Sequence, residues 1–97
     1  MALTTKERAL LKSKCNPLKA SVNVGKGGLT DNVLGEISMG LYHNELVKVN
    51  VLKSSPDNAA TLLARTCEAL ECEPVTRLGN KYCVYKRSDK EDVEHLL

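Results

Sequence analysis

The spacing of the hydrophobic residues changes several times along the chain, and this limits the fold more than any other feature. In residues 46–51 three valines alternate with polar residues, which is typical of a half-buried strand. In residues 30–41 and 55–72 the apolar residues instead recur at three- and four-residue steps, which is typical of helices. A chain of 97 residues fits one domain. The sequence therefore predicts one domain in which short strands and helices alternate.

Capping and turn signals set the boundaries of these elements. Thr4 and Glu7 have the spacing of a capping box, and Thr30 and the Ser55–Pro56 pair are also typical helix starts. Gly79–Asn80 is a two-residue hairpin signal. We expect helices over about 4–14, 30–41 and 55–72, and strands over 21–24, 46–51, 75–78 and 81–86.

This order, α-β-α-β-α-β-β, predicts a two-layer α+β fold with a four-stranded mixed sheet. Crossovers between parallel strands are right-handed, so we expect the second and third helices on the same face of the sheet. Residues 1–97 should form a single domain with its core in about 3–87. The polar residues 88–97 are expected to be a flexible tail.

Charge is divided unevenly along the chain, although the net charge is only +2. Residues 1–26 carry six basic and one acidic side chain (+5), and residues 77–87 carry four basic ones and no acid (+4). Residues 55–73 and 88–97 each carry one basic and four acidic side chains (−3). Such segregation permits a basic face that suits a polyanion. Ordinary clustering of solvated charges is the alternative.

The chain has three tyrosines and no phenylalanine or tryptophan, so its core should be aliphatic. Proteins that read single-stranded bases by stacking need several exposed rings. Tyr82 and Tyr85 are three positions apart on an expected strand and should face opposite sides of the sheet. If the chain binds a nucleic acid, we expect it to do so mainly through the backbone.

The N-terminus is polar and charged within its first eight residues, unlike a signal peptide. No apolar run approaches the roughly 18 residues of a membrane-spanning helix. We therefore expect a cytoplasmic location and no membrane partner.

The four cysteines, Cys15, Cys67, Cys72 and Cys83, are too scattered for a disulfide framework, and a cytosol would keep them reduced. On a helix, Cys67 and Cys72 would not share one side, so we expect no metal site. All four should be buried or half-buried small hydrophobes. A small enzyme with a Cys–His nucleophile, such as Cys15 with His43, stays an alternative, but our expectation is no catalytic site and no cofactor.

A glycine-rich segment, Gly25-Lys26-Gly27-Gly28, follows the first expected strand. Glycines let backbone N–H groups approach an anion, and the start of the next helix adds a positive dipole end. A Walker A loop would need glycine at position 20, and a dinucleotide fingerprint would need glycine or alanine at position 30; neither is present. The remaining possibilities are a G-x-x-G loop that holds a nucleic-acid backbone, as in KH-like modules, and a plain tight turn.

Several motifs together resemble a known family. They are the runs 16–19 (NPLK), 24–30 (VGKGGLT), 43–49 (HNELVKV) and 79–81 (GNK), followed by Val84-Tyr85. In order and spacing they resemble the bacterial YhbY-type RNA-binding proteins, which are stand-alone CRM domains, a module also found in chloroplast splicing and ribosome-maturation factors. The resemblance covers about residues 3–87.

The resemblance implies a fold similar to the C-terminal domain of bacterial translation initiation factor 3. It also implies association with precursor large ribosomal subunits and RNA contact through the G-x-x-G loop. The expected RNA-binding residues are Gly25, Lys26, Gly27 and Gly28, with Lys12, Lys14 and Lys19 beside them. The expected partner is rRNA of the large subunit or its precursor, with ribosomal proteins as further candidates and no DNA. The alternative is a protein-docking adaptor on ribosomal particles that contacts RNA only incidentally; the acidic segments motivate it.

Overall fold

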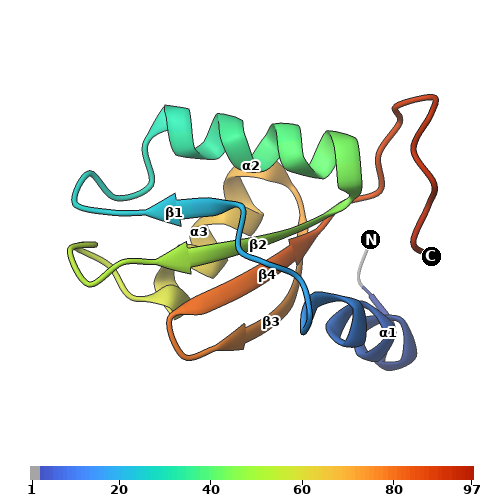
Figure 1. Cartoon of the computed structure of the whole chain (residues 1–97), viewed down its shortest axis with the longest axis horizontal. Coiled ribbons are helices and arrows are strands. Elements are labelled where there is room, and N and C mark those ends of the chain that lie inside the picture. Colours follow the sequence, from blue (N-terminus) through green and yellow to red (C-terminus); the bar gives the residue numbers. More distant parts are fainter. Residues whose placement is uncertain (1–2) are drawn as a thin grey trace.

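The computed structural model describes residues 3–97 and contains seven elements in the expected order (Figure 1). The three helices and the four-stranded mixed sheet confirm the predicted α+β class. The elements are α1 (Thr5–Cys15), β1 (Val22–Val24), α2 (Asp31–Asn44), β2 (Leu46–Val51), α3 (Ala59–Leu70), β3 (Glu73–Leu78) and β4 (Lys81–Tyr85).

The strands lie in the order β1-β2-β4-β3. β1 and β2 are parallel, whereas β4 is antiparallel to both β2 and β3. β3 and β4 form the predicted hairpin, and its turn residue Gly79 has a φ of 61°, a conformation that favours glycine. Because the hairpin folds back, β4 lies in the middle of the sheet and β3 becomes the edge.

The main core lies between the sheet and the pair α2 and α3, which share one face as predicted. Its fully buried members include Ile37, Val49 and Leu62. The expected aliphatic core also contains one ring, since Tyr82 is 1% exposed and its hydroxyl lies 2.9 Å from Thr66 Oγ1. A tyrosine in the core needs such a partner for its hydroxyl.

The opposite face of the sheet is partly covered by α1, so the expected two layers become three at this end. A smaller core forms there from Leu11, Cys15, Leu46, Val75, Cys83 and Tyr85. Tyr82 and Tyr85 therefore lie on opposite faces, as predicted, and both are buried. Neither ring is available to stack on a base.

The first two helix starts were predicted correctly because each depends on local hydrogen bonds. Thr4 and Glu7 form the reciprocal capping box, with the N–H of Glu7 donating to Thr4 Oγ1 at 3.1 Å and the N–H of Thr4 donating to Glu7 Oε1 at 3.0 Å. Thr30 caps α2 by accepting from the N–H of Val33 at 3.2 Å.

The predicted start of the third helix at Ser55 was wrong. Asn58 is the cap, and its Oδ1 accepts from the N–H of Thr61 at 2.9 Å. The Ser55 hydroxyl instead donates to the carbonyl oxygen of Asp57 at 2.8 Å. Two capping residues compete within four positions, and the serine is used in the turn that precedes the helix. The helix also ends earlier than expected, at Leu70.

A disulfide joins Cys15 to Cys83, which contradicts the expectation that all four thiols are reduced. Because α1 packs on the second face of the sheet, its last residue lies over the central strand β4, although 68 positions separate the two cysteines. The predicted burial of these cysteines is confirmed, since both are at most 1% exposed. The nucleophile alternative, Cys15 with His43, is wrong because the Cys15 thiol is consumed in the disulfide.

Cys67 and Cys72 were expected on different sides of a helix, and this was also wrong. Glu71 ends α3 with a φ of 54°, and the chain turns back so that the N–H of Cys72 donates to the Cys67 carbonyl at 3.2 Å. The two thiols then hydrogen-bond, and this bond lowers the pKa of Cys67.

Residues 88–97, expected to be a flexible tail, pack against the fold through Glu45. This carboxylate is fully buried. It accepts hydrogen bonds from the N–H groups of Ser88 at 2.7 Å and Leu96 at 2.9 Å, and His95 Nδ1 lies 2.6 Å from it. The Leu96 side chain packs against the smaller core. Since these partners are more than 40 residues away in sequence, the local polarity of the segment gives no sign of the contact.

The same hydrogen bonds make the stability of the fold depend on pH. Burial raises the pKa of Glu45, but the bonds from Ser88, His95 and Leu96 outweigh burial and hold the pKa below its ordinary value of 4.5. The folded state therefore has the lower pKa. The stabilisation is fully present above the ordinary value and is lost as the pH falls through the folded pKa.

We expect Glu45→Gln to lower the free energy of unfolding by about 2 kcal/mol at neutral pH, because an amide cannot accept all the bonds that a buried carboxylate accepts. The variant should also lose part of the decline in stability below pH 4.5. Urea denaturation across the acidic range measures both effects. The exposed Glu94→Gln serves as the control. Equal stability and equal pH profiles for wild type and Glu45→Gln would show that the carboxylate does not hold the C-terminal segment.

Candidate nucleic-acid interface

The glycine loop, residues 25–28, is a closed turn with an exposed tip. The N–H of Gly28 donates to the Gly25 carbonyl at 3.0 Å, which leaves Lys26 and Gly27 exposed at the tip. Gly28 is buried and has a φ of 71°, so the turn requires glycine there. Among residues 3–97 no acceptor binds the N–H of Lys26 or Gly27. Because the turn uses the Gly28 amide, the expected anion clamp loses this N–H group, while the N–H groups of Lys26 and Gly27 and the Lys26 ammonium remain at the exposed tip.

A second loop packs beside the glycine loop and brings another lysine to it. The N–H of Leu52 donates to the Val24 carbonyl at 2.9 Å. A Cβ placed on Gly25 would lie 3.5 Å from Leu52 Cδ1 and 3.7 Å from Ser54 Oγ. The exposed Lys53 lies between these two contact residues. Sequence reasoning gave no role to Lys53, because only the parallel pairing of β1 and β2 brings the two loops together.

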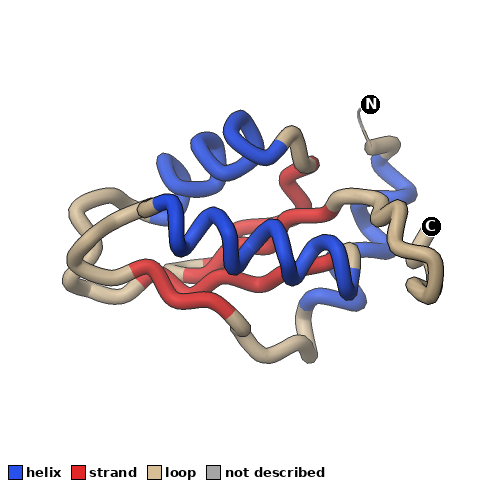
Figure 2. The backbone as a smooth tube through the Cα atoms, turned by 90° about the horizontal axis from the view of Figure 1, so that it is seen from above, coloured by secondary structure: helices blue, strands red, loops and turns tan. Residues whose placement is uncertain are grey.

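The turn between β3 and β4 completes this end of the molecule. The carbonyl of Asn80 accepts from the N–H of Val51 at 2.7 Å, so the turn lies against the end of β2. The next residue, Lys81, is exposed. Figure 1 and Figure 2 show the three connections gathered at one end of the sheet, away from α1 and both termini. Lys26 and Lys53 thus lie on two neighbouring connections, and Lys81 is the first residue of β4, directly after the third; we call this group of three lysines the basic end.

The structure does not bring the lysines of α1 to the glycine loop. Lys12 and Lys14 are exposed on α1, which packs against Leu46 at the start of β2, whereas the glycine loop lies beside the end of β2 (Figure 1). Lys19 is exposed in the connection between α1 and β1. The glycine loop and the α1 lysines are therefore close in sequence but lie at different ends of the sheet.

The basic hairpin, residues 77–87, is also divided. Lys81 belongs to the basic end, whereas Lys86 and Arg87 follow the other end of β4. The Lys86 ammonium donates to the Leu70 carbonyl at 3.0 Å and so stabilises the C-terminus of α3. Lys48 has a similar role, since its ammonium lies 3.4 Å from the carbonyl oxygens of both Cys15 and Asn16 at the end of α1.

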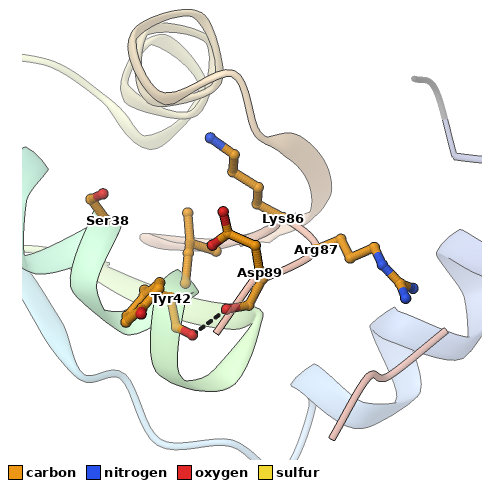
Figure 3. A pocket seen from close by; sticks show the side chains of 7 residues that line it. Ser38, Tyr42, Lys86, Arg87 and Asp89 are labelled. Carbon is orange, nitrogen blue, oxygen red and sulfur yellow. Dashed lines mark hydrogen bonds between the residues drawn. The ribbon is translucent and has the colours of Figure 1, made fainter. Parts of the chain in front are cut away.

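A hollow lies between the C-terminal half of α2 and residues 86–89 (Figure 3). Figure 1 shows that this end of α2 is away from the glycine loop. The Ser88 hydroxyl donates to the Tyr42 carbonyl there, so the hollow is formed where the C-terminal segment packs on α2. Figure 3 shows the Lys86 and Arg87 side chains extending in different directions. The Lys86 and Arg87 cations therefore do not converge on one point of the hollow where both could bind the same ligand.

The described residues show neither of two other kinds of site. Within residues 3–97 no three His, Cys, Asp or Glu side chains are grouped so that they could hold a metal ion. None of the helices in this part of the chain has the length and apolar character needed to cross a membrane.

Known proteins resemble this chain over nearly its whole length. The CRS1/YhbY (CRM) domain family matches residues 3–86. The probable RNA-binding protein YqeI of Bacillus subtilis is 33% identical over 86 residues, covering 89% of this chain and 90% of that protein. A probable RNA-binding protein of Pseudomonas aeruginosa is 32% identical over 90 residues, covering 93% of this chain and 86% of that protein.

A solved structure has the same fold. The solution structure of a Staphylococcus aureus protein, described as a candidate RNA-binding protein, superposes with a TM-score of 0.77 at 30% identity and covers 93% of this chain and 94% of that one. The resemblance found in the sequence motifs is therefore confirmed. The chain belongs to the CRS1/YhbY (CRM) domain family.

Proposed function

We propose that this chain is a non-enzymatic RNA-binding protein that holds the RNA backbone at the glycine loop and acts on precursor large ribosomal subunits. The observation that carries the RNA contact is the pair of N–H groups at Lys26 and Gly27, which have no acceptor in residues 3–97 and lie at the basic end with the exposed side chains of Lys26, Lys53 and Lys81. The names of the relatives support RNA as the partner. The ribosomal target follows from the YhbY-type resemblance.

The chemistry of the loop suits a phosphate. Two backbone N–H groups can donate to phosphate oxygens, while the Lys26 ammonium supplies a mobile positive charge. Asp31 already occupies the first turn of α2, so the anion is held by the loop more than by the dipole of the helix. Tyr82 and Tyr85 are buried, and Tyr42, on α2, is the one exposed tyrosine among residues 3–97. Because a stacking platform needs several exposed rings, the protein reads the shape and the backbone of the RNA instead of stacking on bases.

The lysines of α1 make a second contact in this proposal. An RNA strand that leaves the glycine loop along the uncovered face of the sheet reaches α1, where Lys12 and Lys14 are exposed, and Lys19 precedes β1 on the same route. These residues lengthen the electrostatic footprint and are not part of the clamp.

We expect Lys26→Ala to weaken binding to a structured rRNA fragment and to reduce the slope of log affinity against log salt by about one unit, because one phosphate contact is lost. Fluorescence anisotropy titrations at several salt concentrations measure both quantities. Lys90→Ala, in the C-terminal segment, is the matched control.

Unchanged affinity and slope in Lys26→Ala would remove the glycine loop from RNA binding. If association with ribosomal particles survived exhaustive RNase digestion, the protein-docking adaptor would replace the present proposal.

A further inference from the structure

Three asparagine side chains form a hydrogen-bonded row across the sheet beside the glycine loop. Asn50 Nδ2 donates to Asn23 Oδ1 at 3.1 Å, and Asn80 Nδ2 donates to Asn50 Oδ1 at 3.0 Å. Asn23 lies between the buried Val22 and Val24, so its side chain is on the face opposite α2 and α3. The row, which we call the amide row, therefore lies on the open face of the sheet.

The amide row has a direction and leaves polar groups unused at both ends. Asn80 Nδ2 donates to Asn50 Oδ1 and also to the Val51 carbonyl at 3.1 Å, which uses both of its hydrogens. Among residues 3–97 no partner binds Asn23 Nδ2 or Asn80 Oδ1. Aligned amides polarise one another, which strengthens the donor at one end and the acceptor at the other.

The surroundings of the amide row suit a nucleic acid. Asn23 is two residues before Gly25, so the free amide donor is next to the glycine loop. The cross-strand neighbour of Asn50 is Lys81, and the next position on the same face of β2 is Lys48. Beyond the row the face is hollowed, with a lining that includes Lys81 and the 78% exposed Leu78. The positions that border the row thus carry positive charge.

We propose that the amide row is a nucleotide-binding strip that makes uncharged hydrogen bonds to the nucleotide next to the phosphate held by the glycine loop. This inference rests on the proposed function. Asn23 Nδ2 needs an acceptor, and Asn80 Oδ1, at the other end of the row, needs a donor; a 2′-hydroxyl or the edge of a base can supply either. The clamp at the glycine loop recognises only phosphate. The strip adds uncharged contacts, and these depend on the identity of the nucleotide.

The test is Asn23→Ala, which removes the free donor and leaves the bonds between Asn80 and Asn50 in place. RNA affinity should fall about fivefold, the effect of one hydrogen bond, while the salt slope stays unchanged because no charge is lost. The exposed Asn32→Ala, on α2, is the matched control. Asn23→Asp is a second variant that keeps the acceptor for Asn50 and replaces the donor with a carboxylate, so its affinity should fall further.

Three oligonucleotides of one sequence separate the two sources of the ligand group. If the 2′-hydroxyl binds, wild type should prefer RNA to the 2′-deoxy oligonucleotide and Asn23→Ala should erase this preference. If a base edge binds, Asn23→Ala should weaken the binding of the RNA and of the 2′-deoxy oligonucleotide by the same factor. An RNA in which the bound nucleotide is abasic should then bind wild type and Asn23→Ala with equal affinity. Unchanged RNA affinity in both Asn23 variants, with an effect of Lys26→Ala, would overturn the strip and leave the clamp. No effect of Lys26→Ala would instead count against the proposed function.

Discussion

Reduction of the Cys15–Cys83 disulfide is expected to lower the free energy of unfolding by about 4 kcal/mol. The bond closes a loop of 68 residues, and a cross-link of this span removes much of the entropy of the unfolded chain. In the folded state it ties α1 to the central strand β4, where only a small core holds the helix. Urea denaturation with and without a phosphine reductant measures the difference.

The control for this prediction is the double variant Cys15→Ala/Cys83→Ala. Its stability should match that of the reduced wild type and should not respond to the reductant, although Cys67 and Cys72 are still present. A change of less than about 1 kcal/mol in wild type would mean that the cross-link does not constrain the unfolded chain as loop-closure entropy requires. An equal response in the double variant would assign the effect to the other thiols.

Replacing Lys26, Lys53 and Lys81 together by glutamine is expected to lower RNA affinity by roughly 10²–10³-fold at 0.1 M salt. The salt slope should fall by about three units, one for each phosphate contact. The reason is that the three exposed lysines of the basic end lie at the same end of the sheet and can neutralise phosphates of one RNA segment. Glutamine keeps most of the side-chain length, so the change is mainly one of charge.

The matched control is Arg87→Gln/Lys90→Gln, which removes two charges at the other end of the molecule. Its salt slope should stay close to that of wild type, and circular dichroism should show that both variants are folded. If the control lost as much affinity per charge as the triple variant, binding would depend on net charge alone and the basic end would have no special role.

The parts of the fold that could be predicted from sequence are those that local chemistry decides. The capping box of Thr4 and Glu7, the cap at Thr30 and the hairpin at Gly79 each depend on residues within a few positions of one another. The alternation in residues 46–51 indicates a strand with one buried face, and β2 has these bounds. A local prediction can still be wrong where two residues could cap the same helix, as Ser55 and Asn58 show.

The parts that could not be predicted depend on contacts between distant residues. Cys15 meets Cys83 only because α1 packs on the second face of the sheet, and nothing in either local sequence indicates this. Glu45 is an ordinary acidic residue in the sequence. Its burial follows from the C-terminal segment, which covers it and supplies its donors.

The candidate site also divides into parts that local sequence predicts and parts that depend on contacts between distant residues. The spacing of Gly25 and Gly28 predicts a tight turn, which the structure contains, because the turn closes within four residues; phosphate binding by this turn stays a proposal. Lys53 and Lys81 join it through strand pairing, which a charge count cannot reveal. Conversely, Lys12 and Lys14 are near the loop in sequence, but α1 carries them to the other end of β2.

The most direct test of the RNA clamp is a nuclear magnetic resonance titration of the ¹⁵N-labelled protein with an rRNA fragment. We expect the largest early changes in amide chemical shift at Lys26 and Gly27, whose N–H groups would donate to phosphate, with smaller changes at Lys53 and Lys81. The N–H of Gly28, which is bonded within the turn, should move less. Shift changes confined to α3 and the C-terminal segment, with Lys26 and Gly27 unmoved at saturation, would contradict the central claim.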